Sequence, residues 1–337
     1  MTSTLAVIIV NYKSADLIMD ALGSLFRETS ASRSMEIWVV DNASGDDSKE
    51  RITGAFPSVR WIDMGYNAGF ARANNAAIRA AGEKDVLLLN PDTIILDKAV
   101  ERAYDQLTAS EYVACGVQLI NPDGTPQISG NYFMKGGLNH LLPLPYLGGL
   151  LRWVGYRLGT KVPNVLQSQS IQEVDWISGA FLMVKRIAIE KAGLMDEDFF
   201  LYGEEVEWCS RLHKVGKMCL FGDERIVHLQ GEAVMVEHGS SAKGYQGLFT
   251  RKDFQLMVSN HLRIRKQFGI GWFLFLLFNY SVGVPVYFVG SFLHRLFTLR
   301  NPFGEWGQAS QFAVNVVGIW KLLPLIIRNK PHFYKVM

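Results

Sequence analysis

Apolar runs alternate with segments of helical periodicity along the N-terminal part of the chain. The runs LAVIIV, EIWVV and VLLL carry almost no polar interruption, which is typical of strands buried on both faces. The predicted strands are 5–10, 36–40, 59–62 and 86–89. Between them, apolar residues recur at helical spacing, and the predicted helices are 17–26, 70–81 and 97–108. This alternation predicts an α/β fold with a parallel, doubly wound sheet and right-handed crossovers.

The run VLLLNPDT (86–93) is predicted to be the central strand of this sheet. It should stop at Asn90-Pro91, because proline cannot continue the ladder. Asp92 then lies at the carboxyl edge, where open α/β sheets bind ligands. The second strand also ends in an acid, Asp41, and the first ends at Asn11, so the three side chains are expected to converge. An ordinary capped turn is the alternative for both acids.

Beyond about residue 113 the alternation ceases. Asn121-Pro122-Asp123-Gly124 predicts a hairpin turn. The stretch 136–157 is rich in Leu, Gly, Pro and aromatic residues, and it suits either an apolar flap or a buried excursion. A strand is predicted at 181–184, followed by a short helix that ends before Gly193.

A second group of candidate residues lies in DEDFFLYGEEVEWCSRLHKVGK (196–217). Glu204 and Glu205 begin a predicted helix, where acids complement the helix dipole. Adjacent helical residues project about 100° apart, so one of the two can face a cleft, where a raised pKa would suit a general base. A last strand is predicted to end at His228, which is either structural or, near an aspartate, a metal ligand.

Composition narrows the function classes. The net charge of +2 argues against nucleic acid as the main partner. The three cysteines show no metal-ligand spacing and are too few for a disulfide scaffold, which favours a reduced cytoplasmic setting. No basic region precedes the first strand, so no signal peptide is expected. The Gly65–Gly69 loop lacks both GxGxxG and GK[ST], which disfavours a dehydrogenase or a P-loop enzyme.

The C-terminal part contains a long uncharged run, Phe268 to Leu293. It is long enough to span a bilayer, but polar residues and Pro285 interrupt it, and basic residues flank both ends, which conflicts with a single span. A second apolar stretch, 312–327, is interrupted by Lys321 and Pro324. We expect a segment that lies in or dips into the cytoplasmic leaflet. A buried helix pair or a homodimer interface is the alternative.

Together, these motifs resemble the inverting, metal-dependent glycosyltransferases of family 2, which have the GT-A nucleotide-sugar fold. The matching segments, in the family's order, are VIIVNY, VVDNAS, NAGFARANN, LLLNPDT, SGAFLMVKR, FFLYGEEVEWCSRL and HLQG. The resemblance runs from about Leu5 to Gly231 and is closest to the rhamnosyltransferase-like branch that builds bacterial surface polysaccharides. It implies a catalytic domain, 1–235, followed by a helical, membrane-associating region, 236–337.

The resemblance also implies residue roles. Asp41 contacts the nucleobase of the donor. Asp92 ends the metal-binding triplet, and His228 is a further ligand of Mg²⁺ or Mn²⁺. The family's Glu-Asp pair reads Glu204-Glu205 here, so Glu205 is expected to be the base and Glu204 a supporting acid. The other implied donor-binding residues are Asn11, Tyr12, Asn67, Gly69, Phe70, Asn74 and Asn90. The implied acceptor-side residues are Trp176, Ser178 and Gly179.

The expected activity is one-step, inverting transfer of a sugar such as rhamnose. The donor would be a dTDP- or UDP-sugar and the acceptor a lipid-linked saccharide. The protein would be peripheral or monotopic at the cytoplasmic side of the inner membrane. A sugar nucleotidyltransferase is an alternative, although NYKSAD is not the Gly-rich basic loop expected after its first strand. A catalytically inactive, membrane-bound assembly subunit is another.

Overall fold

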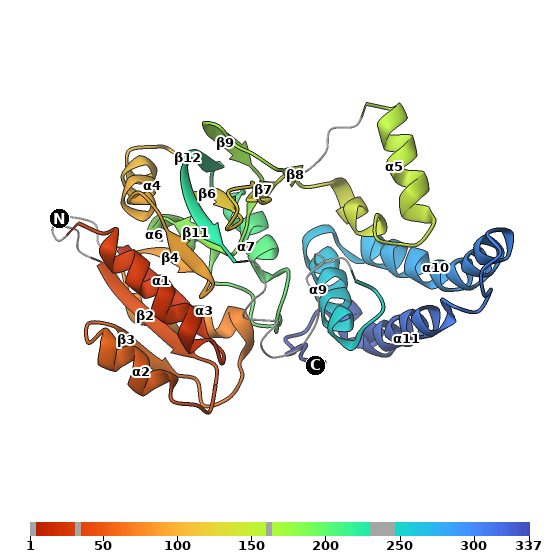
Figure 1. Ribbon diagram of the computed structural model, residues 1–337, viewed down its shortest axis with the longest axis horizontal. Coiled ribbons are helices and arrows are strands. Elements are labelled where there is room, and N and C mark those ends of the chain that lie inside the picture. Colours follow the sequence, from red (N-terminus) through yellow and green to blue (C-terminus); the bar gives the residue numbers. More distant parts are fainter. Residues whose placement is uncertain (1–4, 31–34, 160–163, 230–246) are drawn as a thin grey trace. The chain divides into compact units, whose positions relative to one another are not determined.

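The structure is a computed structural model that describes residues 5–30, 35–159, 164–229 and 247–337. The chain forms two compact units (Figure 1). The first comprises Met1–Tyr132, Pro163–Glu197 and Glu204–Ala242. The second comprises Phe133–Val162, Asp198–Gly203 and Lys243–Met337. The chain therefore leaves the first unit twice before its C-terminal part.

A nine-stranded sheet forms the centre of the first unit, in the order β3-β2-β1-β4-β11-β6-β12-β5, with β9 beside β12. The strands are β1 (Leu5–Asn11), β2 (Met35–Asp41), β3 (Arg60–Asp63), β4 (Asp85–Leu89), β5 (Thr93–Ile95), β6 (Ala114–Ile120), β9 (Ile171–Val174), β11 (Phe181–Val184) and β12 (Met218–His228). The predicted strands are all present, and β4 is central.

The sheet is mixed rather than wholly parallel. Strands β1 to β4 pair in parallel, as do β6 and β12. Strand β11 runs antiparallel to both β4 and β6, and β5 and β9 run antiparallel to β12. The expected parallel pairing therefore holds for β1 to β4, whereas the antiparallel strands β5, β9 and β11 all follow β4 in the chain. The fold class, an α/β fold with a central, mostly parallel sheet, is confirmed.

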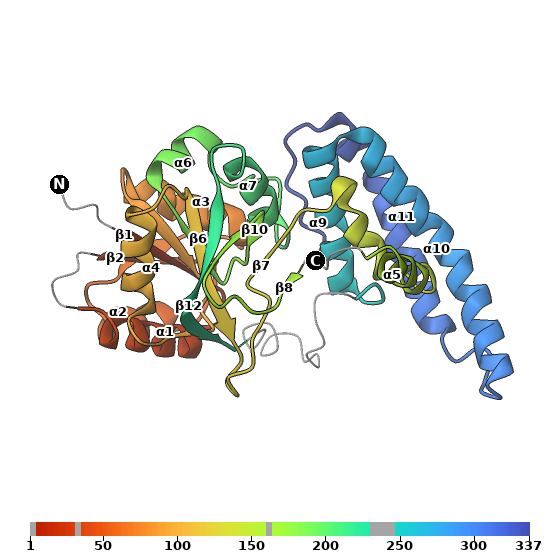
Figure 2. The same ribbon diagram turned by 90° about the horizontal axis from the view of Figure 1, so that it is seen from above.

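Helices cover both faces of this sheet. They are α1 (Ala15–Arg27), α2 (Ser48–Ala55), α3 (Gly69–Ala81), α4 (Ala99–Thr108), α6 (Arg186–Ala192) and α7 (Glu204–Leu212). Successive strand residues point to opposite faces. Leu5, Val7 and Ile9 of β1 accordingly pack with α1, α2 and α4, whereas Ala6 and Ile8 pack with α3, α6 and α7. Figure 2 shows α3, α6 and α7 on one side of the sheet, opposite α1 and α2.

A small second sheet, β10-β7-β8, extends the first unit. Its strands are β7 (Gly130–Asn131), β8 (Asn164–Val165) and β10 (Trp176–Ile177). The predicted hairpin turn precedes it: the Gly124 amide donates to the Asn121 carbonyl at 2.9 Å, and the Asn121 amide donates to the Thr125 carbonyl at 2.8 Å. This turn returns the chain toward the end of β6.

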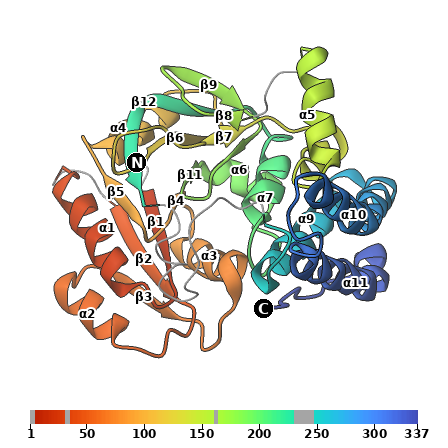
Figure 3. The same cartoon turned by 45° about the vertical axis from the view of Figure 1, so that its right-hand side comes forward.

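The second unit is helical. Its elements are η1 (Lys135–Leu141), α5 (Leu147–Arg157), α9 (Arg251–Phe268), α10 (Ile270–Phe297) and α11 (Trp306–Arg328). Helices α9, α10 and α11 lie together (Figure 3). Of the stretch 136–157, Leu141 and Leu144 join the core of this unit with Phe273 and Phe312, whereas α5 is largely exposed. The apolar C-terminal helical extension is confirmed.

Candidate active site

Several strand ends of the first unit bring polar side chains to one edge of the main sheet. Asn11 and Asp41 are register partners at the ends of β1 and β2. His228 ends β12 opposite Thr93, the neighbour of Asp92. Because β11 is antiparallel, its first residue, Phe181, pairs with the last residue of β4. The segment Ser178–Ala180, which directly precedes β11, therefore lies at the same edge.

Asp41 is held in place by hydrogen bonds from its neighbours. The Asn11 amide donates to Asp41 Oδ1 at 2.7 Å, the Ser44 hydroxyl donates to the same oxygen, and the Ser44 amide donates to Oδ2 at 3.0 Å. A carboxylate can accept about four hydrogen bonds, so Asp41 retains capacity for one more. Asp41 therefore caps the turn that follows β2, as the alternative interpretation expected. The same carboxylate can still accept a hydrogen bond from a ligand.

Two residues just after β1 and β2 adopt left-handed backbone conformations that are uncommon for non-glycine residues. These are Lys13, with a φ of 53°, and Ala43, with a φ of 60°. The turns return Ser44 to the Asn11 side chain, whose amide lies 3.0 Å from its hydroxyl. Such strain tends to cluster at functional sites. Tyr12, beside Lys13, is partly exposed.

The loop before α3 is tied to the end of β2 by Asn42, a residue that the sequence analysis missed. Asn42 Nδ2 donates to the Gly69 carbonyl at 3.1 Å, and its Oδ1 accepts from the Ala68 amide at 3.3 Å. Gly69 has a φ of +76°, and its main-chain amide donates to Asn67 Oδ1 at 3.2 Å. The signal in the sequence was the position of Asn42 directly after the strand-ending acid.

Asp92 and His228 face each other at the carboxyl edge. His228 Nε2 lies 3.4 Å from Asp92 Oδ1, and both side chains are buried. The Leu229 amide donates to the Asp92 carbonyl at 2.9 Å, which joins the two segments. Asn90 contributes through its main chain, with its amide 3.1 Å from the Ala180 carbonyl.

This pair suits a divalent cation, although it is incomplete alone. A carboxylate and an imidazole are both ligands of divalent metals, and here they lie close enough for one ion to touch both. In the described ranges, no group of three or more His, Cys, Asp or Glu side chains could hold a metal. The remaining ligands would have to come from substrate oxygens or water.

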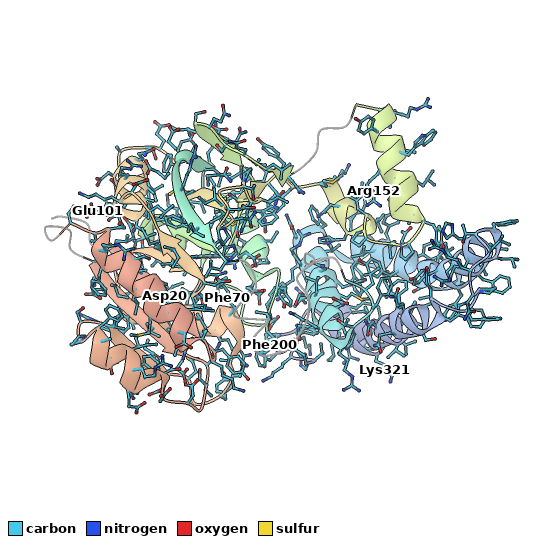
Figure 4. All side chains as sticks on the ribbon, in the orientation of Figure 1. Asp20, Phe70, Glu101, Arg152, Phe200 and Lys321 are labelled. Atoms are coloured by element: carbon cyan, nitrogen blue, oxygen red, sulfur yellow. The ribbon has the colours of Figure 1, made fainter. Side chains whose placement is uncertain are left out.

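Glu204 and Glu205, the first two residues of α7, have different surroundings. Glu204 is 2% exposed, whereas Glu205 is partly exposed. A Cβ built on Gly179 would lie 3.6 Å from Glu205 Cγ and 3.9 Å from Phe70 Cε1. Glu205, Gly179 and Phe70 are therefore neighbours, and Figure 4 labels Phe70 near the start of α3. The accessible glutamate is the one predicted to be the base.

Other predicted residues have local structural partners. Asn74 Nδ2 donates to the carbonyl of Phe70 at 2.9 Å, within its own helix. The Ser178 amide donates to the Ser129 carbonyl at 2.9 Å, so the small sheet positions the segment before β11. Trp176, in β10, is partly exposed. Glu207 is bound by Arg211 at 2.7 Å, which makes it a structural acid of α7.

The cysteines of this unit are buried and free. Burial raises the pKa of Cys209, and likewise that of Cys219, to about 12. A thiol with so high a pKa carries almost no thiolate at neutral pH. These cysteines therefore pack as apolar side chains of the core.

Solved structures of two glycosyltransferases share this fold. GalNAc-T7 with UDP, GalNAc and Mn²⁺ aligns with a TM-score of 0.53 and 14% identity, covering 77% of this chain and 48% of that one. The mannosyltransferase PcManGT from Pyrobaculum calidifontis, with GDP-Man and Mn²⁺, aligns with a TM-score of 0.54 and 15% identity, covering 94% and 87%. The fold of the chain is thus of the GT-A type.

Sequence comparison is more specific. Residues 6–162 match Glycosyl transferase family 2. The chain is 27% identical over 223 residues to the low-salt glycan biosynthesis hexosyltransferase Agl10 of Haloferax volcanii, covering 64% of this chain and 63% of that protein. It is 28% identical over 238 residues to the N-acetylglucosaminyl-diphospho-decaprenol L-rhamnosyltransferase of Mycobacterium tuberculosis, covering 66% and 74%. Part of the first unit is therefore similar to family 2 glycosyltransferases, and the similar proteins include a rhamnosyltransferase.

Proposed function

We propose that the protein is an inverting glycosyltransferase that moves a sugar from a nucleoside-diphosphate-sugar to a lipid-linked saccharide in cell-surface polysaccharide synthesis. The observation that carries the proposal is that Asp41, Asp92 and His228 lie at or just after strand ends on one edge of the main sheet, and that Glu205 lies beside Gly179, which precedes β11. The similarity to hexosyl- and rhamnosyltransferases supports this reaction class. We favour a dTDP- or UDP-sugar, with rhamnose as the leading candidate sugar, since another relative is the dTDP-rhamnosyl transferase RfbF of Shigella flexneri, 24% identical.

We assign binding of the donor's nucleobase to Asp41. Its carboxylate is fixed by Asn11 and Ser44 and can accept one further hydrogen bond, as from an N–H on the edge of a pyrimidine. Because its neighbours already orient it, Asp41 would lose little conformational freedom on binding. We assign supporting positions around the donor to Tyr12, Asn67, Gly69, Phe70, Asn74 and Asn90.

We assign binding of the donor's diphosphate to the Asp92–His228 pair, together with Mg²⁺ or Mn²⁺. When bound, the cation neutralises negative charge on the diphosphate leaving group. Asp92 and His228 would hold it from one side, because both are buried and face each other at 3.4 Å. That the fold neighbours GalNAc-T7 and PcManGT were solved with Mn²⁺ supports a divalent ion.

Glu205 is assigned as the general base. It would take the proton from an acceptor hydroxyl, whose oxygen then forms a bond to the anomeric carbon while the bond from that carbon to the diphosphate oxygen breaks. Attack from the face opposite the leaving group inverts the configuration in one displacement. Glu205 lies beside Gly179, where an added Cβ would be 3.6 Å from its Cγ. Trp176 and Ser178 are assigned to the acceptor side.

A membrane location is proposed from the surface of α10. This helix exposes apolar side chains at spacings of three and four residues, which places them along one face. They are Phe275, Phe278, Val282, Val286, Val289, Leu293 and Leu296; we call this set the α10 stripe. Soluble proteins rarely expose a continuous apolar patch of this length.

Charge beside the α10 stripe favours an anionic bilayer as its partner. Arg295 and Arg300 lie at its C-terminal end, Arg328 is the last residue of α11, and Lys330 follows that helix. Both α10 and α11 are long and apolar enough to cross a membrane, yet Lys321 is exposed on α11, where Figure 4 shows it pointing outward. We propose a monotopic attachment to the cytoplasmic leaflet of the inner membrane. The domain 1–235 would be catalytic, and 236–337 would bind the membrane.

The experiment is a donor screen with the full chain. The purified protein is incubated with dTDP- and UDP-sugars, Mg²⁺ or Mn²⁺, and a short lipid-linked saccharide, and the released nucleoside diphosphate is measured. We expect release with a preferred donor, a lengthened saccharide, and loss of both when EDTA is added. Release of pyrophosphate from a nucleoside triphosphate would indicate a sugar nucleotidyltransferase instead. No turnover of any donor, with the fold intact, would favour the inactive assembly subunit.

A further inference from the structure

Gln127 is a buried polar residue in the first unit that has no role in the site described above. It lies just after the 121–124 turn, and its main-chain amide donates to the Leu119 carbonyl at 2.8 Å. Its side chain reaches His228, which is 101 positions away in the sequence. A buried amide is costly unless it is hydrogen-bonded, so its partners define its orientation.

The orientation of the Gln127 amide is fixed by two acceptors. Nε2 donates to the main-chain oxygen of His228 at 2.6 Å and to Asn121 Oδ1 at 2.7 Å. A carbonyl oxygen can only accept, so the atom facing the His228 carbonyl must be the amide nitrogen. The opposite atom, Oε1, is therefore the one that lies 2.9 Å from Nδ1 of the His228 ring.

The tautomer of His228 follows from this orientation. Because Gln127 Oε1 is an acceptor, Nδ1 must carry the hydrogen and donate it. In the neutral ring, Nε2 then has a lone pair, and it is Nε2 that lies 3.4 Å from Asp92 Oδ1. Two electron-rich atoms thus face each other, an arrangement that a shared cation stabilises.

Gln127 binds His228 at two points. One bond holds the main chain at the end of β12, and the other holds the ring nitrogen farthest from Asp92. Together they fix the position and the rotation of the imidazole. Hydrogen-bonded partners of this kind orient metal-ligating histidines, and their loss commonly weakens metal binding by about 10- to 100-fold.

We propose that Gln127 is a positioning residue that fixes the Nδ1–H tautomer of His228 and presents Nε2, with Asp92, to a divalent cation. The inference rests on the proposed function, because that function assigns the cation. It adds a residue whose effect is exerted through His228 and does not require contact with the substrate.

The first measurement is the tautomer. In ¹⁵N spectra of the metal-free protein at about pH 8, we expect the His228 ring, identified by its loss in His228→Gln, to carry its proton on Nδ1. In Gln127→Met, which has a similar length and no hydrogen bond, we expect the more common Nε2–H form to appear. A Nε2–H ring in the unaltered protein would overturn the proposal.

The second measurement is Mn²⁺ affinity, determined from the free-ion electron paramagnetic resonance signal in the presence of a nucleoside diphosphate. Gln127→Met should weaken Mn²⁺ about 10- to 100-fold. The matched control is Gln106→Met, which removes a bond of 2.8 Å from Gln106 to Glu224 in the same unit. The Mn²⁺ affinity of the Gln106→Met variant should match that of the unaltered protein.

A double variant separates positioning from general destabilisation. In a His228→Ala background, Gln127→Met should cause no further loss of Mn²⁺ affinity, because its effect acts through the ring. Equal losses in both backgrounds would overturn the proposal. If the tautomer and this coupling are found but no sugar donor is turned over, the proposed function fails while the positioning role stands.

Discussion

The side-chain amide of Asn11 donates a 2.7 Å hydrogen bond to Oδ1 of Asp41, and the two residues are register partners at the ends of β1 and β2. The carboxylate is therefore oriented before any ligand arrives. If Asp41 positions the donor, Asp41→Ala should raise the donor KM by about tenfold or more and change kcat much less. Steady-state kinetics with varied donor measures this. A large fall in kcat at unchanged KM would show that the role is wrong.

The Asp92–His228 pair makes a prediction about charge. Asp92→Asn keeps the shape of the side chain but cannot balance the charge of a cation, so turnover should fall by about a hundredfold or more. Turnover is measured at saturating donor, with the folded state checked by thermal unfolding. Asp223→Asn is the control, because Asp223 is an exposed acid of β12, the strand that also bears His228. Full activity in Asp92→Asn would remove this residue from the site.

The two glutamates of α7 can be separated directly. Glu205→Gln keeps the size of the side chain but cannot take a proton, so sugar transfer should fall by orders of magnitude while donor binding barely changes. Glu204→Gln should retain more activity, since Glu204 is only 2% exposed. Glu207→Gln is a structural control that breaks the bond to Arg211. A dead Glu204→Gln beside an active Glu205→Gln would reverse the assignment.

Glu205→Asp tests the reach of the base. The substitution restores the aspartate that the family usually carries, but it shortens the side chain by about 1.5 Å, the length of one carbon–carbon bond. Because misplacement by about 1 Å can cost about a hundredfold, we expect transfer to fall well below that of the unaltered protein at saturating donor. Equal or higher activity would mean that the backbone near Gly179 does not require glutamate.

The α10 stripe predicts an effect on membrane binding. Combined Phe278→Glu and Val289→Glu should weaken binding to anionic vesicles by about tenfold or more, because charged side chains are costly in the apolar layer. Cosedimentation measures the bound fraction. Ile187→Glu is the matched control, since Ile187 is 52% exposed on α6, close to the 60% of Val289. If the double variant instead turned a dimer into a monomer and left vesicle binding unchanged, the stripe would be a homodimer interface.

Acid should destabilise the helical unit. Burial lowers the pKa of His261 to about 4, and burial with neighbouring Arg263 lowers the pKa of His140 well below its usual value. Both folded-state values lie below the unfolded value of about 6.5, so the unfolded state binds more protons. Stability is therefore complete above about pH 6.5 and falls toward pH 4, by about 3 kcal/mol for His261. Unfolding temperatures at pH 7.5 and 5 should differ less in His261→Phe; an unchanged difference would contradict this assignment.

Local pattern predicted the first half of the main sheet well. Strands β1, β2 and β4 are built mainly on apolar runs, and the polar residues that end or follow them, Asn11, Asp41 and Asp92, lie at the predicted edge of the sheet. Strands β5 and β10 were not predicted from the sequence. They have three and two residues, respectively, which is too short to show periodicity. The packing of Leu141 and Leu144 with α10 and α11 was not predicted either, because it joins residues that are distant in the sequence.

The site was predictable only in part. Asp41, Asp92 and His228 are chemically conspicuous residues at strand ends. Gln127 and Asn42 carry no such signal, because their importance lies in the atoms that they contact. The preference for Glu205 over Glu204 came from the resemblance to the family's Glu-Asp pair, whereas the difference in their exposure required the structure, because adjacent positions on a helix do not determine it.

The reversed direction of β11 has a practical consequence for attaching this protein to a surface. Because β11 begins at the edge where β4 and β6 end, the opposite edge of the sheet carries none of the residues assigned to donor, cation or acceptor. Glu83 and Glu111 are exposed just before β4 and β6, on that opposite edge. Immobilisation or fluorescent labelling through cysteines introduced there would leave the edge that carries these residues unmodified.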